Sequence, residues 1–433
     1  MAFSVTMAVL LYLDRFALNV MQPVVMKELD IDMSQMGWVT GAFFWAYALA
    51  QVPAGTLGDR WGARATLALF VAAWSLAFAA QALAISLVML IVFRALQGVA
   101  QAGAYAVTAG FLKHWSPAST RGFANSSVSM GGRAGGVLTN VLTPLFVAAV
   151  IPMLLRLGWT NSEGQGAWRF VFLCYALLSL VWAVAFWWWF RNVPEEHAGV
   201  NAAELALLRD FSVAEASHDK VAATNAGPIP PWYVVFQNRN LWLLSCIMFC
   251  VNVGWIFLAT SQTTYLSSVF KMSLVKAGSY TAFTAFAGMA GCICGGLATD
   301  WLVRVLGVVW GRRLPGVIAC GGAATMYLVS LLLHTPETVA LVFASVYFLN
   351  DFLLGSLWST VQDVGRRNSG TMFGFINMSG NLGAAIFPPV IGMLVDAKNW
   401  EGVFIVSAGA FLVAFALWFL VDPRIKLPEH VAA

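Results

Sequence analysis

The sequence predicts an all-α polytopic membrane protein with twelve transmembrane helices in two pseudo-symmetric six-helix bundles. First, 60% of its 433 residues are hydrophobic and only 10% are charged, whereas an average soluble protein carries roughly 25% charged residues. Second, the chain contains repeated apolar segments, each of the roughly 20 residues that a spanning helix needs. Third, these segments fall into two groups of six on either side of a polar stretch, so each group is expected to form one bundle.

The predicted spans define three regions of the chain. The first bundle is expected to cover residues 1–190, a cytoplasmic linker residues 191–238 and the second bundle residues 239–433. The linker is polar and contains four prolines, which a continuous helix does not tolerate in its interior. The spans are expected at residues 3–25, 36–57, 65–84, 87–111, 123–152, 169–190, 240–267, 275–299, 314–334, 338–361, 372–395 and 402–421.

The positive charges predict the orientation in the membrane. Of the 24 Lys and Arg residues, three lie inside predicted spans, fifteen on one side and six on the other. Because Lys and Arg accumulate in cytoplasmic loops, both termini and the linker are expected in the cytoplasm, with the protein integral to the cytoplasmic (inner) membrane. The first span contains Asp14 and Arg15, unlike the uninterrupted apolar region of a cleavable signal peptide.

The composition also bears on the classes of function. No basic run suited to nucleic acid is present, and the six cysteines all lie in apolar segments, where free Cys acts as a small hydrophobic residue. The histidines lie at span ends or in loops, and no nucleotide-binding P-loop is found. We therefore expect neither metal nor cofactor and no enzymatic activity; the expected partners are the lipid bilayer and a small solute, with a functional monomer.

The two halves repeat a loop sequence. Residues 55–64 read GTLGDRWGAR after the second span, and residues 296–304 read GLATDWLVR after the eighth, 241 positions later. A repeat of half the chain is typical of secondary transporters. The residues expected to form a gating loop at these places are Asp59, Arg60, Arg64 and Asp300.

The first of these loops matches the pattern G-x-L-x-D-R-x-G-x-R, so the chain resembles the major facilitator superfamily. It is most similar to the anion:cation symporter branch, which includes bacterial sugar-acid/proton symporters and animal vesicular glutamate and sialic acid transporters. Tyr12-Leu-Asp14-Arg15 is similar to the YxDR signature of that branch, and residues 94–98 (RALQG) resemble a fourth-helix motif. Trp358 and residues 377–381 (NMSGN) resemble motifs of the tenth and eleventh helices.

Polar side chains inside a bilayer are costly and usually serve a cavity or a partner. Arg15 lies about 18 Å along the first helix, near mid-membrane, where a guanidinium can grip a carboxylate at two points. The resemblance places the branch's substrate-binding arginine at this position. Asp14 points about 100° away around the helix and is expected to carry a coupling proton, with a fixed salt bridge as the alternative.

Three further spans contain charged residues whose roles the sequence leaves open. The branch usually has a glutamate for proton coupling seven residues after Arg94, but this chain has Gln101, which cannot carry a proton. Arg133 in the glycine-rich fifth span either binds the anion or pairs with Asp351. Asp351 correspondingly either replaces the missing glutamate as a proton site or neutralises Arg133.

The expected substrate contacts combine these charged residues with motif positions. Tyrosine hydroxyls, a flat indole and amide side chains can contact a carboxylated or hydroxylated solute. The full set of expected substrate-binding residues is Tyr12, Arg15, Tyr47, Arg94, Gln101, Arg133, Trp358, Asn377 and Asn381, with Asp14 and Asp351 as proton-coupling residues.

The resemblance implies a secondary active transporter. We expect import of a small organic anion, such as a sugar acid, by proton- or cation-coupled alternating access between the two bundles. Because Gln101 cannot carry a proton, an uncoupled facilitator or an anion exchanger is the alternative. A membrane sensor that binds the solute without transporting it is the alternative from a different class.

Overall fold

The computed structural model describes residues 1–115, 121–160, 166–197, 199–201, 204, 236–365 and 369–426. Regular structure in these ranges is helical. Most of the predicted linker lies outside them. The helices of the first half are α1 (Ala2–Leu29), α2 (Met33–Trp61), α3 (Ala63–Gln81), α4 (Leu87–Gln101), α5 (Ala104–Trp115), α6 (Arg121–Arg156) and α7 (Ala167–Trp189). Those of the second half are α10 (Arg239–Thr260), α11 (Gln262–Val269), α12 (Leu274–Ser330), α13 (Pro336–Gly365), α14 (Ser369–Asp396) and α15 (Trp400–Trp418).

Nine helices within the described ranges are long and apolar enough to cross a membrane. One of them, α12, has 57 residues, enough for two spans. Together with α2 and the consecutive pair α4 and α5, they account for the twelve predicted spans. The prediction of an all-α membrane protein is confirmed.

Two spans and one loop differ from the prediction. The fourth span breaks between α4 and α5, and the seventh breaks at Ser261, between α10 and α11. The predicted loop between the eighth and ninth spans is instead helical, interrupted only at Gly307, which has a φ of 74°. Glycine adopts this left-handed conformation without a steric penalty, so the chain turns there while helix continues on both sides.

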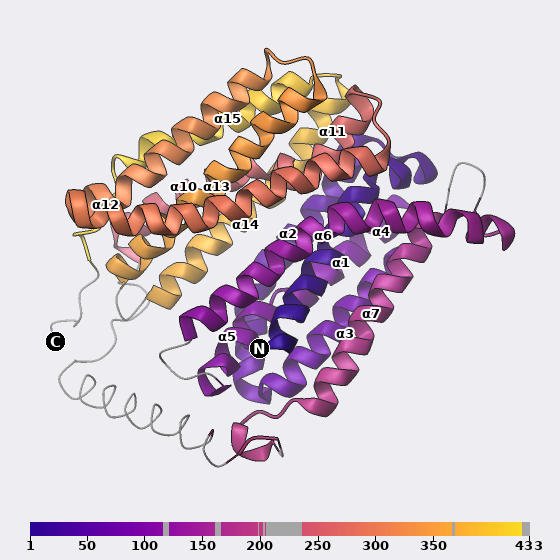
Figure 1. Ribbon diagram of the computed structural model, residues 1–433, viewed down its shortest axis with the longest axis horizontal. Helices are drawn as coiled ribbons and strands as arrows, with labels where there is room; N and C mark the ends of the chain where they lie inside the picture. Colours follow the sequence, from indigo (N-terminus) through magenta and orange to yellow (C-terminus); the bar gives the residue numbers. More distant parts are fainter. Residues whose placement is uncertain are drawn as a thin grey trace.

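The two halves lie side by side, with the N-terminus toward the lower side of the view (Figure 1). We call the end of the bundles that carries the N-terminus the terminal end, and the opposite end, where α2 begins, the distal end. At the distal end α2 packs against α14: a Cβ added to Gly37 would lie 2.3 Å from the Pro388 carbonyl oxygen. Asp396 accepts hydrogen bonds from the backbone N–H groups of Met33 and Ser34, at 3.0 and 2.7 Å.

These contacts predict that Gly37→Val will open the distal end. The added side chain has no room against the α14 backbone, and overpacking of this kind costs about 1–3 kcal/mol. Spin labels at Ile85, in the loop between α3 and α4, and at Glu401, at the start of α15, report on the distal ends of opposite halves. The distance between them should increase in a cysteine-free background. Gly374→Val on α14 is the matched control, because an added Cβ there meets nothing within 4 Å; an equal change in that control would refute the steric explanation.

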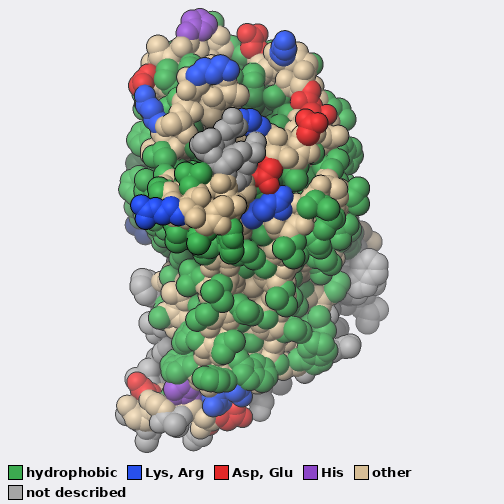
Figure 2. Space-filling model, turned by 90° about the vertical axis from the view of Figure 1, so that its right-hand side faces the viewer, with side chains coloured by type: hydrophobic (Ala, Val, Ile, Leu, Met, Phe, Trp, Pro, Cys, Tyr) green, Lys and Arg blue, Asp and Glu red, His purple; other side chains and the backbone are tan. Residues whose placement is uncertain are grey.

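Hydrophobic side chains form a broad band on the surface shown in Figure 2, and charged side chains gather above and below it. Large exposed apolar residues such as Leu76, Trp188 and Leu332 belong to helices or helix ends of both halves. Lipid chains cover such a band without the cost that water would impose. The molecule is therefore an integral membrane protein.

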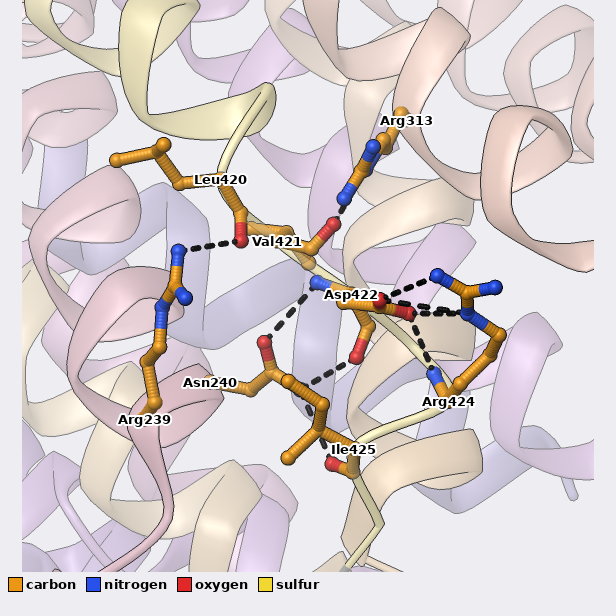
Figure 3. Close-up of polar contacts among 8 residues, drawn as sticks. All are labelled: Arg239, Asn240, Arg313, Leu420, Val421, Asp422, Arg424 and Ile425. Atoms are coloured by element: carbon orange, nitrogen blue, oxygen red, sulfur yellow. Dashed lines mark hydrogen bonds and ion pairs between the residues drawn. The ribbon is translucent and has the colours of Figure 1, made fainter.

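The segment that follows α15 is tied to α10 and α12 at the terminal end (Figure 3). The Asn240 side chain donates to the carbonyl oxygens of Asp422 and Ile425, at 2.7 and 3.1 Å, and accepts from the Asp422 N–H at 3.2 Å. The Arg313 guanidinium donates to the Val421 carbonyl. A hydrogen bond from Arg424 lowers the pKa of Asp422 to about 2, so this ion pair persists at physiological pH.

We expect Asn240→Ala to destabilise this end of the second half. The substitution leaves the partly buried Asp422 carbonyl without its donor, which costs about 1–3 kcal/mol, while the Ile425 carbonyl keeps a longer hydrogen bond from Asn238 at 3.4 Å. Arg424→Ala removes an exposed ion pair on the same segment, and a pair of this kind contributes little to stability. Thermal unfolding in detergent and proteolysis of the C-terminal segment compare the two variants. A larger loss of stability in Arg424→Ala than in Asn240→Ala would contradict the importance given to the Asn240 hydrogen bonds.

Candidate functional site

A cavity of about 340 Å³ lies between the two halves. Its walls come from α1, α5 and α6 of the first half and from α10, α12 and α13 of the second. The aromatic side chains that line it are Tyr12, Phe16, Tyr105, Trp255, Tyr347 and Trp358. The polar and charged ones are Ser129, Arg133, Asn140, Asn252, Asn350 and Asp351.

An ion pair crosses this cavity from one half to the other. Arg133 on α6 pairs with Asp351 on α13, and the Asn350 side chain donates to Asp351 at 3.2 Å. The close approach of α12 is possible because residue 288 is glycine, whose added Cβ would lie 2.8 Å from the Asp351 carboxylate. The structure thus brings Arg133 and Asp351 together at the cavity wall, where a solute can reach both.

Arg15 lies beside the cavity and behind the Tyr12 ring. Its guanidinium carbon is 5.2 Å from the centre of that ring and 4.7 Å from the centre of the Tyr47 ring. Its Nε donates to Gln101 Oε1 at 3.0 Å. Its Nη2 is buried and has no partner among the described residues. Arg15 is itself outside the lining of the cavity, and an unpaired guanidinium N–H is a strong donor for an anion.

Arg94 and the two glutamines that follow it hold α4 against α1. The fully buried Arg94 donates to Gln97 Oε1 and to the Arg15 carbonyl oxygen, both at 2.8 Å. Gln97 donates to the Asp14 carbonyl at 3.0 Å, and Gln101 donates to the Leu11 carbonyl at 3.3 Å. Arg94 and Gln101 are not among the residues that line the cavity; in this arrangement they position Arg15.

Asp14 points into the first bundle rather than toward the cavity. It is fully buried and accepts hydrogen bonds from Ser179 at 2.6 Å and from Trp74 at 3.1 Å. Its second oxygen, Oδ1, has no partner within the described ranges. The Asp14 carboxylate is thus held by neutral donors, whereas the Asp351 carboxylate is paired with a cation.

The remaining predicted contacts are divided between the cavity and its surroundings. Trp358 lines the cavity, whereas Tyr47 lies against Arg15. Asn377 donates to Gln51 of the other half at 3.5 Å, and Asn381 donates to the Asn377 carbonyl at 2.8 Å. Asn377 therefore lies at the seam between α14 and α2, and both amides are outside the lining of the cavity.

The predicted gating loop is partly described. Arg64 donates from its backbone N–H to Asn192 and from its Nε to the Trp187 carbonyl, at 2.9 and 2.8 Å. Its guanidinium lies over the Trp187 ring at 4.7 Å, so it links α3 to the end of α7. Asp300 is exposed on α12. The side chains of Asp59 and Arg60 lie outside the described part of the structure.

Several cavity residues were not expected from the sequence. Asn140 lies seven residues after Arg133 on α6 and hence on the same helix face, a spacing that would have identified it. Trp255 and Tyr347 lie in strongly apolar spans, and nothing in the local sequence distinguishes such cavity-lining aromatics from packing residues.

Twelve spans in two halves around a central cavity define a polytopic membrane carrier. The family model of the Major Facilitator Superfamily matches residues 5–369 and 364–432, and the chain belongs to that superfamily. It is a membrane transporter by family and not an enzyme. The resemblance inferred from the loop motif is confirmed at the level of the family.

Individual relatives agree with this assignment. The chain is 26% identical to a probable sulfoacetate transporter of Cupriavidus necator, over 94% of this chain and 89% of that protein. It is 26% identical to the hexuronate transporter of Bacillus subtilis, over 98% and 94%. A bacterial homologue of the human lysosomal transporter Spinster, solved inward-facing and unoccupied, superimposes with a TM-score of 0.78 at 19% identity, covering 99% of this chain and 97% of that one.

Proposed function

We propose that this protein is a secondary active transporter that imports a small organic anion, such as a sugar acid, by proton-coupled alternating access. The observation that carries the proposal is a cavity between the halves with Arg133 in its wall and Arg15 beside it. The names of the relatives support the class of solute, because sulfoacetate and hexuronate are both small organic anions.

The charge balance around the cavity favours an anion. Arg133 is neutralised by Asp351, whereas the Arg15 guanidinium donates to the neutral Gln101. The carboxylate nearest in sequence, Asp14, is directed at Trp74 and Ser179. Arg15 thus supplies positive charge and an unsatisfied donor to a solute carboxylate, and Arg133 supplies a second cation when Asp351 releases it.

The coupling proton is proposed to bind at Asp351. This carboxylate faces the cavity and a cation, and protonation would free Arg133 for the solute. Asp14 stays the second candidate, but it would have to exchange protons through the packed interior of the first bundle. Gln101 keeps uncoupled exchange as the competing function, because a neutral amide cannot titrate.

The distribution of Lys and Arg supports an orientation of the transport cycle in the membrane. With the termini in the cytoplasm, as the excess of Lys and Arg at that end favours, the packed distal end faces outward. The halves would then part toward the cytoplasm, and rocking about the central cavity would expose it alternately to the two sides. In this proposal the structure represents the inward-facing state.

Binding should require the carboxylate of the solute. A carboxylate accepts charge-assisted hydrogen bonds from arginine, which contribute about 1.5–3 kcal/mol, so the amide analogue should bind roughly 10- to 150-fold more weakly. Thermal-shift titrations with small acids, such as D-gluconate and D-galactonate, and with their amides provide the measurement. Equal stabilisation by an acid and its amide would contradict an anion site.

A further inference from the structure

A second, small cavity continues the central one toward the distal end. The two cavities share Phe16, Asn140 and Ala259 in their walls. The second measures about 10 Å³, about the room that a single water molecule or hydroxyl group occupies. It lies against the break in the seventh span, between α10 and α11.

Two buried amide side chains line this small cavity with unpaired polar atoms. Asn19 is 4% exposed, and neither its Nδ2 nor its Oδ1 has a partner among the described residues. Gln262 is fully buried; its Oε1 accepts from Thr284 at 3.0 Å, but its Nε2 has no partner in the same part of the chain. Buried polar groups are nearly always paired, so these three atoms indicate a missing polar ligand.

The unpaired atoms match one hydroxyl group. A hydroxyl has two lone pairs and one proton, and the cavity offers two amide N–H donors and one carbonyl acceptor. Of the three unpaired atoms, a cation would satisfy Asn19 Oδ1 alone and would face the two donors. A carboxylate would accept from both donors but would meet the Asn19 oxygen without a proton between them.

The position of Asn19 relates this cavity to the anion site. Asn19 follows Arg15 by four residues, hence by one helical turn or about 6 Å, on the same face of α1. A solute that extends from a carboxylate held near Arg15 toward the distal end would place a hydroxyl of its chain at this depth. Asn19 belongs to the first half and Gln262 to the second, so such a hydroxyl would bridge the two halves.

We propose that Asn19 and Gln262 form a hydroxyl-recognising subsite that makes the transporter selective for hydroxylated acids. The inference rests on the proposed function, since it assumes an anion in the central cavity. A site built around a hydroxyl disfavours the analogue that lacks it, by as much as about 10⁴-fold when no water takes its place. We expect a preference of at least about 10-fold, because water can fill this small space.

The test compares D-gluconate with hexanoate, which has the same chain length and no hydroxyl group. Affinities of the full-length protein are measured for both acids in the wild type, Asn19→Leu and Gln262→Leu. Asn238→Leu is the control, because Asn238 is a buried amide at the start of α10, away from both cavities. Size-exclusion chromatography and thermal unfolding establish that each variant is folded.

The subsite predicts that the wild type prefers D-gluconate and that each cavity variant lowers the preference at least about 10-fold, with hexanoate affinity unchanged. The control should keep the wild-type preference. Asn19→Leu and Gln262→Leu are independent, so the test can be decided with either variant if only one of them folds. An unchanged preference in a folded variant would show that the cavity holds a structural water only and would overturn the subsite alone. Failure of the wild type to bind any small acid would overturn the proposed function and the subsite with it.

Discussion

Arg15→Lys is expected to weaken binding of the solute about 10- to 150-fold and to leave the protein folded. Lysine keeps the charge but loses the planar pair of donors that grips a carboxylate, and a charge-assisted hydrogen bond contributes about 1.5–3 kcal/mol. We expect solute affinity to be sensitive to this substitution, because Arg15 Nη2 is buried without a partner among the residues described. Equilibrium titration with an acid that stabilises the wild type measures the effect.

Arg169→Lys is the matched control for this substitution. Arg169 also makes partly buried contacts, to Glu28 and to the carbonyls of Ala82 and Ala84, but it lies at the distal end and outside the central cavity. Its replacement should lower the unfolding temperature without changing affinity. Wild-type affinity in Arg15→Lys would remove Arg15 from the binding site.

Asp351→Asn is expected to abolish accumulation of the solute against its gradient and to preserve exchange. Asparagine fills the same space beside Gly288, but it cannot release and take up a proton. The internal concentration of the solute should therefore not exceed the external one in liposomes with an imposed pH gradient. Exchange of internal for external solute, measured on the same preparation, should continue, since it requires only rocking of the loaded carrier.

The chain offers a close control on the same helix. Asp363 of α13 pairs with Arg312 at 2.9 Å outside the cavity, so Asp363→Asn removes a carboxylate–arginine pair without touching the proposed proton site. It should retain pH-driven accumulation. Asp14→Asn tests the second candidate in the same way. Accumulation that survives in both Asp14→Asn and Asp351→Asn would exclude proton coupling through these carboxylates.

The fold could be predicted because the bilayer imposes a length and an apolar composition on every span. The interruptions of the helices could not be predicted in this way. Helix continues through the charged residues around Gly307 because their side chains are at the membrane boundary, where hydropathy cannot separate a loop from a solvated helix. The interruption at Ser261 lies in a short polar stretch of the seventh predicted span, residues 260–264 (TSQTT), and no proline or glycine marks it.

The candidate site was predictable only in part. Charged residues inside spans were conspicuous in the sequence, and the alternative that paired Arg133 with Asp351 corresponds to a contact in the structure. Adjacent positions on a helix point in different directions, so Asp14 faces the first bundle while Arg15 lies beside the cavity. Asn19 was not singled out, although its spacing of four from Arg15 placed it on the same face. The tilt and packing of neighbouring helices decide which of these faces meets the cavity, and a single sequence does not contain that information.

Solute flux into liposomes that contain the purified protein tests the central claim most directly. The probe is a small acid that stabilises the wild-type protein, and its uptake is followed with and without an acidic exterior. We expect the internal concentration to rise above the external one only while the pH gradient lasts, and to equalise when the gradient is collapsed. An acid that binds the protein but never crosses the membrane would contradict a transporter and point to a sensor. Uptake that ends at equal concentrations under every ion gradient would contradict the coupled mechanism and leave the uncoupled one.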